Sequence, residues 1–167
     1  MSEKAEPRRG FEEVERFLAA HGIRHAVTEH VDTYTAAAEA RAAAVSPQHA
    51  AKTVMVRDDD GYVLAVIPAS EALDLHKLRR LTSRPHLRLA AESELAADFP
   101  QFELGALPPF GALFGSPELI DHRLLAGQRI LCNGGDHRHS IALDARELQA
   151  ASHAKVADLV AEPRGPR

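Results

Sequence analysis

Three short stretches of the sequence carry groups that could do chemistry, and the first is Lys52. It lies in the apolar run Ala51–Arg57, which reads Ala-Lys-Thr-Val-Met-Val-Arg. In a strand Lys52 shares a face with Val54 and Val56, because side chains alternate. An amine on an apolar face must reach water, a partner or an anionic ligand. Lys52 is therefore a candidate to hold a phosphate or a carbonyl oxygen, with snorkelling to the strand end as the structural alternative.

The second stretch is Gly105–Gly111, which reads Gly-Ala-Leu-Pro-Pro-Phe-Gly. Adjacent prolines remove two backbone donors and fix two φ angles, so this segment is neither a helix interior nor a central strand. The flanking glycines allow left-handed φ values and close approach of the backbone to another group. Such a stiff apolar loop can line a small-ligand pocket without charged side chains. A rigid surface turn is the alternative that local composition favours.

The third stretch is the turn Gly134-Gly135-Asp136-His137 with Arg138 and His139 after it. It could place backbone N–H groups and an imidazole at one site. The spacing of His137 and His139 puts both rings on one strand face, as a metal site would require. The chain has ten histidines but no His-Glu-x-x-His motif and no pair of cysteines. We therefore expect no metal and no cofactor, and favour a hairpin turn followed by exposed histidines.

A basic segment, 76–88, stands out in a chain of net charge −4. Its cations are Lys77, Arg79, Arg80, Arg84 and Arg88. A solvated helix face is the usual explanation for such a run. The sharper hypothesis is contact with a phosphate backbone by Lys77, Arg79 and Arg80, with weak and salt-sensitive binding.

Familiar covalent machinery is missing from the sequence. There is no Gly-x-Ser-x-Gly elbow, no phosphate-binding P-loop and no dinucleotide fingerprint. The single cysteine, Cys132, lies in an apolar strand, where a structural thiol is expected. An enzyme of this kind would act by positioning and electrostatics. One cysteine and no long apolar segment predict a cytoplasmic protein without a membrane partner.

The elements that would position these stretches predict one domain. The chain has 167 residues and 45% hydrophobic side chains, enough for a single core. Periodicity predicts helices over about 10–22, 35–45, 75–81, 92–99 and 145–150, and strands over 23–29, 51–57, 62–67, 87–90, 113–114, 118–121, 129–132 and 139–143. We expect a single mixed α/β domain over 10–160, with a mixed, largely antiparallel central sheet flanked by helices and flexible termini at 1–9 and 161–167.

Four of these features occur in the order seen in one known family. They are Ala51-Lys52-Thr53-Val54, the strand Tyr62–Pro68, the Gly105–Gly111 loop and the glycine-rich turn with His137. On these motifs the chain resembles the YbaK/EbsC family over roughly residues 20 to 160. Members are trans-editing proteins related to the editing domain of bacterial prolyl-tRNA synthetases. Gly105 and Pro109 fit the family's Gly-x-x-x-Pro loop.

The resemblance implies a YbaK-like fold and hydrolysis of the ester that links a wrong amino acid to the 3′ end of a tRNA. It implies that Lys52 contacts the terminal nucleotide and that the loop from Gly105 to Pro109 places the aminoacyl carbonyl. Residues Ala106, Leu107, Pro108 and Phe110 belong to that loop, and Gly134, Gly135, Asp136 and His137 to a third pocket wall. Tyr34 and Thr35 lie where the family lines the amino-acid pocket. Asp136 departs from the small hydroxyl residue expected before the histidine.

The expected partner is therefore an aminoacyl-tRNA, with a synthetase as a further candidate. Because the ester is already labile, fixing its carbonyl and aiming backbone N–H groups at the developing oxyanion could suffice. The main alternative is a relative that binds tRNA ends or a small metabolite in the same pocket without hydrolysis. A metal-dependent hydrolase built on His137 and His139 is the second alternative.

Overall fold

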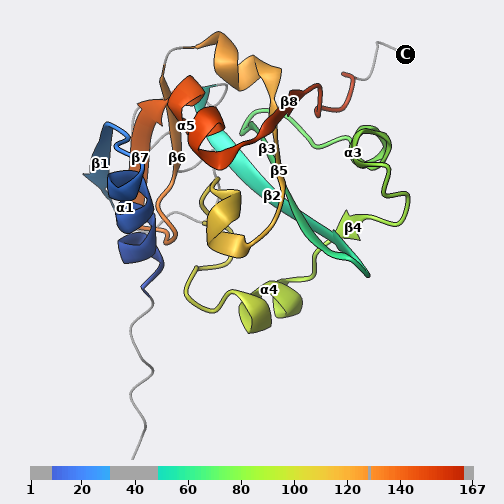
Figure 1. The fold of residues 1–167 in the computed structure, drawn as a ribbon, viewed down its shortest axis with the longest axis horizontal. Coiled ribbons are helices and arrows are strands. Elements are labelled where there is room, and N and C mark those ends of the chain that lie inside the picture. The colour runs from blue at the N-terminus through green and yellow to red at the C-terminus, as the bar shows by residue number, and fades with distance from the viewer. Residues whose placement is uncertain (1–8, 31–48, 128, 164–167) are drawn as a thin grey trace, which may run out of the picture.

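The computed structural model describes residues 9–30, 49–127 and 129–163, which form a mixed α/β domain (Figure 1). The helices are α1 (Gly10–Ala20), α3 (Leu75–Thr82), α4 (Glu92–Asp98) and α5 (Ala145–Ser152), with 3₁₀ helices η2 (Gly111–Phe114) and η3 (His122–Ala126). The strands are β1 (His25–Glu29), β2 (Ala51–Asp58), β3 (Gly61–Pro68), β4 (Arg88–Leu89), β5 (Glu118–Asp121), β6 (Arg129–Asn133), β7 (His139–Asp144) and β8 (Lys155–Ala157). The expected fold class is confirmed.

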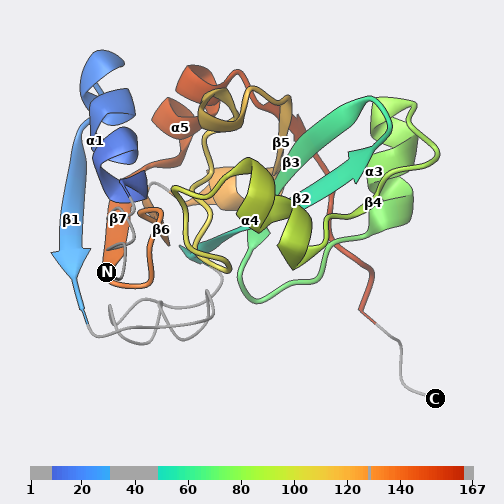
Figure 2. The same ribbon diagram turned by 90° about the horizontal axis from the view of Figure 1, so that it is seen from below.

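The strands form two hydrogen-bonded sheets. One has the order β1-β7-β6 and is antiparallel throughout. The other has the order β4-β2-β3-β5-β8, in which β3–β5 and β5–β8 are parallel and the remaining pairs antiparallel. An isolated parallel bridge between Ala50 and Leu131 connects them. Figure 2 shows the three-stranded sheet at one end of the molecule and the β2–β3 hairpin with α3 at the other.

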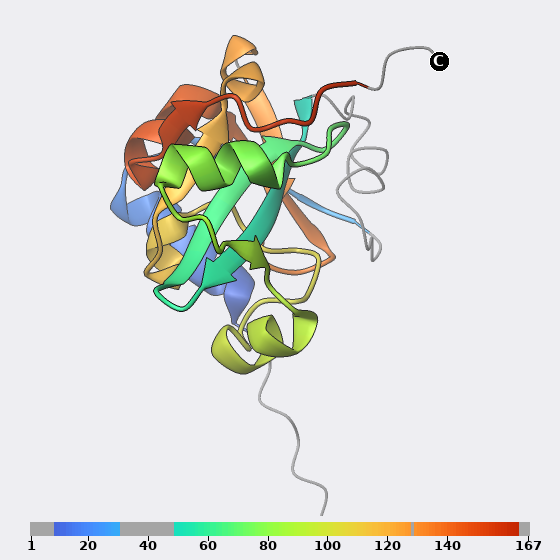
Figure 3. The same ribbon diagram turned by 90° about the vertical axis from the view of Figure 1, so that its right-hand side faces the viewer.

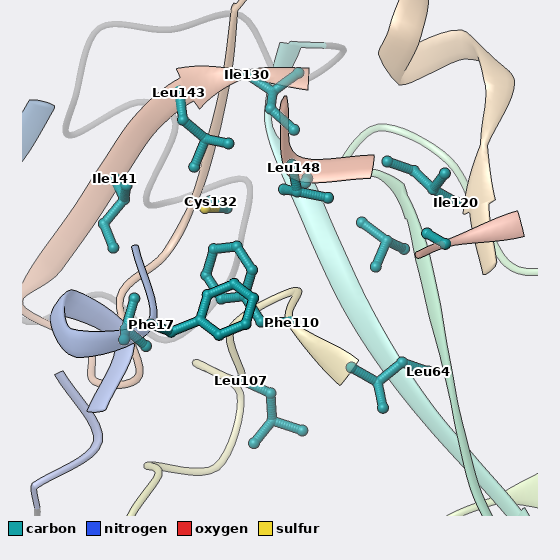
Figure 4. Packing of buried hydrophobic residues seen from close by; sticks show 14 of the residues in the cluster. Phe17, Leu64, Leu107, Phe110, Ile120, Ile130, Cys132, Ile141, Leu143 and Leu148 are labelled. Carbon is teal, nitrogen blue, oxygen red and sulfur yellow. The ribbon is translucent and has the colours of Figure 1, made fainter. Parts of the chain in front are cut away.

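The β2–β3 hairpin is buried on both faces, as its apolar sequence predicts. Leu64 and Val66 point into the main core, which also holds Met55 of β2 and the buried face of α1. Their neighbours Val63 and Ala65 face a second core, which α3 covers through Leu78 (Figure 3). In the main core Phe17 of α1 packs against Phe110, with ring centroids 4.9 Å apart (Figure 4).

Two aspartates cap helices through their side chains. Asp74 accepts a hydrogen bond from the Lys77 N–H at the start of α3 (3.1 Å), and Asp144 accepts from the Arg146 N–H at the start of α5 (2.8 Å). Each satisfies a donor that the first helical turn leaves without an intrahelical partner. None of the described helices is long and apolar enough to cross a bilayer.

One local prediction is wrong, one falls outside the described residues, and two elements of the structure were not predicted. Residues 113–114 belong to η2 and not to a strand, because a buried carboxylate, Glu118, accepts the Gly111 N–H at 2.7 Å and fixes the start of a 3₁₀ turn. Strand β8 and helix η3 have no counterpart among the sequence predictions. The helix predicted over 35–45 lies outside the described residues.

Candidate functional site

A pocket of about 370 Å³ opens where the two sheets part. The sheets meet at the Ala50–Leu131 bridge, and the strands β2 and β6 diverge beyond it. The lining comes from β2 (Lys52, Thr53, Val54, Met55), the β4–α4 segment (Leu89, Ala90, Glu92, Leu95), the loop before η2 (Leu104, Gly105, Leu107) and the end of β6 (Asn133). Two of the stretches singled out in the sequence, around Lys52 and Gly105, therefore border one cavity.

Lys52 enters this pocket from β2 with its amine already positioned. Its side chain is half-buried, and Nζ donates a hydrogen bond to the Glu71 carbonyl oxygen at 2.9 Å. That bond uses one of the three N–H donors of an ammonium group. Burial lowers the pKa of Lys52 from its ordinary value, while the Glu71 carboxylate opposes that change. The geometry leaves the amine able to donate to an anion or a carbonyl oxygen in the pocket.

The edge of β2 contributes backbone groups as well. Strand β4 pairs only with Val56 and Arg57, so the part of this edge that begins at Lys52 borders the pocket. The Ala69 N–H donates to Ala50 O across the hairpin, and the Ala90 N–H donates to Met55 O from the outer side. Since hydrogen-bonded pairs alternate along an antiparallel ladder, Thr53 directs its N–H and C=O to the outer edge. The cavity therefore meets the backbone donor and acceptor of Thr53 beside the charged side chains of Lys52 and Glu92.

The loop opposite Lys52 begins with a tight turn centred on Gly105. The Ala106 N–H donates to Glu103 O at 3.0 Å, and Gly105 has a φ of +82°. A type II turn requires that conformation at its third position, and glycine adopts it without strain. Gly105 is exposed, whereas the loop residues Ala106, Leu107, Pro108, Pro109 and Phe110 are buried. The turn therefore presents a glycine backbone at the rim, and the following residues anchor it in the core.

Within the loop only part of the predicted set lines the pocket. Gly105 and Leu107 do so, and Phe110 instead packs against Phe17 in the main core. Pro109 accepts a long hydrogen bond from the Ser152 hydroxyl of α5 at its carbonyl oxygen (3.4 Å). The buried residues hold the loop against α1 and α5, so they fix the position of Gly105.

His137 is buried behind the loop and binds it directly. Its Nε2 lies 2.7 Å from Leu104 O, and because a carbonyl can only accept, Nε2 carries the proton. The carboxylate of Glu103 lies 3.7 Å from the same nitrogen. The imidazole therefore contacts both Glu103 and Leu104, the first two residues of the turn.

The remaining residues of the glycine-rich turn support this segment from behind. Gly135, with φ +94°, accepts the Glu103 N–H at its carbonyl oxygen (3.0 Å), and a Cβ at this position would lie 3.0 Å from the carbonyl carbon of Gly10. At Gly134 a Cβ would lie 2.9 Å from His139 O. Asp136 accepts hydrogen bonds from the N–H groups of residues 138 and 139 and from His139 Nδ1. In the described residues this turn reaches the pocket through its neighbour Asn133.

Asn133 lines the pocket, although the sequence analysis did not identify it as a site residue. It is buried, lines the pocket and pairs with Ser140 across the β6–β7 ladder. Ser140 is fully buried, and its hydroxyl lies 2.6 Å from His30 Nε2. A buried asparagine at a strand end before two glycines is the signal that could have identified it. Tyr34 and Thr35, predicted for the amino-acid pocket, lie outside the described residues.

The basic segment divides into paired and unpaired cations. Lys77 Nζ binds the carboxylates of Asp158 (3.0 Å) and Glu162 (3.3 Å) and the Val160 carbonyl oxygen, which raises the pKa of Lys77. Two further cations of the segment, Arg84 and Arg88, pair with Asp58 and Glu94 respectively. Arg79 donates Nε–H to Leu87 O at 2.8 Å, and Arg80 is exposed. Neither Arg79 nor Arg80 forms an ion pair with a described residue, so these two remain to meet an anion.

The candidate metal ligands are engaged in other contacts. His139 is bound by Asp136 and stacks on Phe11 at 3.9 Å, while His137 holds the loop. Elsewhere, ligand atoms of Asp121, His122 and Asp158 lie within 4.8 Å of one another. Arg123 Nη1 pairs with both of those carboxylates, at 3.1 and 3.0 Å, so a guanidinium already balances them.

Comparison with solved structures places this architecture among known ones. A crystal structure described as a "putative trans-editing enzyme for prolyl tRNA synthetase" is 28% identical with a TM-score of 0.81, covering 92% of this chain and 98% of that one. A hypothetical protein is 27% identical with a TM-score of 0.80, covering 88% and 98%. A "putative signal transduction protein" from Marinobacter aquaeolei VT8, 19% identical with a TM-score of 0.68, shares the fold over 89% of this chain and 30% of its own.

Comparison with curated proteins found no match. The family model described as the aminoacyl-tRNA editing domain matches residues 30–151, which include β2, the Gly105 turn and the glycine-rich turn. With most of the described fold inside that match, the chain belongs to the aminoacyl-tRNA editing domain family.

Proposed function

We propose that this protein is a trans-editing deacylase, which hydrolyses the ester of a mischarged aminoacyl-tRNA in the pocket between the two sheets. The observation that carries the proposal is the convergence of Lys52 and the Gly105 turn on one cavity of about 370 Å³. That volume lies within the range of small-ligand sites and suits an amino acid on a ribose. Family membership supports the substrate class, because the matching model is that of an editing domain.

The chemistry needs no side-chain nucleophile. A water molecule adds to the ester carbonyl carbon, and negative charge develops on the carbonyl oxygen before the bond to the ribose oxygen breaks. The ribose oxygen takes a proton, which leaves a free amino acid and an uncharged tRNA. Backbone N–H groups at Thr53 and in the Gly105 turn are suited to stabilise the oxyanion, since fixed donors in a water-poor site need no reorganisation.

In this proposal Lys52 binds the terminal nucleotide. Its half-buried amine, held by Glu71 O at 2.9 Å, is a compact cation for a phosphate or ribose oxygen. The exposed Leu89 and the partly buried Leu95 offer an apolar wall for the nucleobase. His137 acts through the loop that it holds and not as an acid or base.

We further propose that Arg79 and Arg80 of α3 contact the acceptor-stem backbone. With His76 they border a second hollow of about 380 Å³ on α3. The hydrogen bond from Arg79 to Leu87 O ties this helix to the segment that leads into Leu89 and the pocket. The solved structure described for prolyl-tRNA synthetase suggests a tRNA of that system as the first to test.

The decisive experiment incubates the protein with a panel of tRNAs carrying wrong, radiolabelled amino acids and measures release of the label. We expect release from at least one of them, and a decrease of about 10- to 100-fold in kcat/KM in Lys52→Ala, because a hydrogen bond from a charged group to the terminal nucleotide is worth about 1.5–3 kcal/mol. Lys155→Ala is the matched control, because Lys155 is exposed and borders a different cavity. Binding of tRNA with the ester left intact would identify a non-catalytic binder instead.

A further inference from the structure

The part of the candidate pocket that β6 supplies is a buried polar side chain, Asn133. Asn133 is 7% exposed, and its side-chain amide forms no hydrogen bond with a described residue. Its Oδ1 and Nδ2 are not fully enclosed by protein atoms, so both reach the space of the pocket. Buried amides normally satisfy their one acceptor and two N–H donors. Asn133 therefore offers the pocket an acceptor and donors that the described residues leave unused.

The strand register places Asn133 beside Lys52. Ala50 of β2 and Leu131 of β6 form a parallel bridge, and their side chains pack together on one face. Lys52 and Asn133 each follow by two residues, and side chains alternate along a strand, so both project from that same face. Both also line the pocket. An ammonium group and an amide therefore face neighbouring parts of whatever the pocket holds.

The pattern of donors and acceptors indicates which part of an aminoacylated adenosine meets the amide. The Lys52 ammonium group and the Thr53 N–H can only donate, which suits a phosphate, a ribose oxygen or the ester carbonyl. The α-ammonium group of the amino acid only donates, and the carboxylate of Glu92, at the rim, is the stronger acceptor for it. The Asn133 amide both donates and accepts, as a hydroxyl group does. The free ribose hydroxyl next to the ester is therefore the best match.

We propose that the Asn133 side chain binds the free 2′-hydroxyl of the terminal ribose. Nδ2 donates to the hydroxyl oxygen, and Oδ1 accepts the hydroxyl proton in a hydrogen bond. The 2′-hydroxyl is the group by which a protein distinguishes RNA from DNA. Fixing it also orients the ester on the adjacent ribose carbon. This inference rests on the proposed function, because it requires the aminoacyl end of a tRNA in the pocket.

The test is a binding cycle with two stable analogues. Both are tRNAs that carry the amino acid through a 3′-amide in place of the ester, and one of them lacks the 2′-hydroxyl. The amino acid is the one released fastest in the deacylation panel, or alanine if none is released. Titration calorimetry gives the Kd of each analogue, and the readout is the ratio of the 2′-deoxy Kd to the 2′-hydroxyl Kd.

This ratio isolates the contact between the amide and the hydroxyl. We expect a ratio of about 3 to 10 in the wild type, the value of one neutral hydrogen bond, and a ratio near 1 in Asn133→Ala. Asn133→Leu keeps the size of the side chain without polar atoms and should give the same result where the alanine variant does not fold. Gln101→Ala is the matched control, because it removes a side-chain amide that lies outside the pocket lining, and it should keep the wild-type ratio.

The possible failures are distinguishable. A ratio near 1 in the wild type, or an unchanged ratio in both Asn133 variants, would overturn the assignment of Asn133, while release of amino acids in the deacylation panel would still support the deacylase. Binding of neither analogue by the wild type, together with no release in the panel, would overturn the proposed function and this inference with it.

Discussion

The hydrogen-bond partner of each polar residue near the pocket indicates the role of that residue. His137 uses its Nε2–H on Leu104 O at 2.7 Å and is buried, which makes it a positioning residue in our proposal. Lys52, by contrast, is half-buried at the pocket with only the Glu71 carbonyl oxygen as its described acceptor. The same distinction separates Asp136, which binds its own turn, from Asn133, which borders the cavity.

Replacement of His137 by phenylalanine tests this distinction. The ring volume is nearly kept, but Leu104 O loses its donor, and an unsatisfied buried carbonyl costs about 1–3 kcal/mol. We expect that decrease in the free energy of unfolding, measured with urea, together with a lower kcat for deacylation. Because the histidine acts only through the loop, the pH profile of kcat should be unchanged. His86→Phe, at an exposed position, is the control. A lost limb of the pH profile would show direct proton transfer by His137.

Glu118 predicts a pH dependence of stability. Its pKa is raised from about 4.5 to about 8 by burial, so the folded state holds the proton more tightly than the unfolded chain does. Its contribution to stability is therefore complete below about pH 4.5 and is lost as the pH rises through 8. Urea unfolding between about pH 5 and about pH 8.5 should show stability falling with pH, and Glu118→Gln should remove that slope. An unchanged slope, or a slope equally altered in the exposed Glu147→Gln, would contradict this.

At the scale of elements, the Glu103–Ala106 turn and the helix η2 hold the proline-rich segment at both ends. The first is fixed by the Ala106 N–H and His137, and the second by the bond from the Gly111 N–H to Glu118. Between them the chain is buried, so the exposed Gly105 has little freedom to move. The position of this one peptide relative to β2 is thus set by several separate anchors.

Gly105→Ala should damage the site more than the fold. A φ of +82° costs a residue with a Cβ about 1–2 kcal/mol, so either the stability falls by that amount or the turn rearranges. We expect a lower kcat/KM for deacylation. Gly22→Ala provides the control, because Gly22 also has a positive φ, +63°, and its Cβ would meet no atom within 4 Å. Equal stability losses with activity lost only in Gly105→Ala would place the effect at the pocket. Equal activities would remove the turn from the site.

The sequence predicted those elements whose signal is local. The two strands of the β2–β3 hairpin and the helices α3 and α5 follow from the periodicity of their apolar residues. It missed β8, a three-residue strand that exists through parallel pairing with β5. It also placed a strand at 113–114, because the buried acceptor that makes η2 comes seven residues after Gly111. Asn133 escaped notice because its place depends on how two sheets diverge, which no local pattern encodes.

For the whole molecule, the distribution of charge matters more than its sum. The chain is acidic overall, with a net charge of −4, yet Arg79 and Arg80 lie together on α3. Figure 2 shows α3 at one end of the molecule and α1 with β1 at the other. A tRNA that engages α3 would therefore approach from a single side, with its 3′ end directed along β4 to the pocket.

Reversal of both arginines tests that approach. Arg79→Glu with Arg80→Glu should weaken tRNA binding and reduce the slope of log K against log salt by about 2, since each phosphate contact adds about one unit. The matched control reverses two exposed arginines outside α3, Arg24→Glu with Arg146→Glu. Filter binding at several salt concentrations gives both quantities. Affinity and salt slope equal to those of the control would show that α3 is ordinary solvated surface.

The junction of the two sheets has a consequence for selectivity. Its packing consists of Ala50 and Leu131 with Ala69 and Ala142, so three of its four side chains are single methyl groups. Because these side chains are small, the two sheets approach closely at the junction. A larger side chain there is expected to separate the sheets and widen the pocket between them without changing a residue of the pocket. A series at Ala50 with valine and then leucine should shift the preferred aminoacyl group toward larger side chains, as the deacylation panel would reveal. Substitutions at this junction would therefore alter which aminoacyl group is preferred while the residues that line the pocket stay the same.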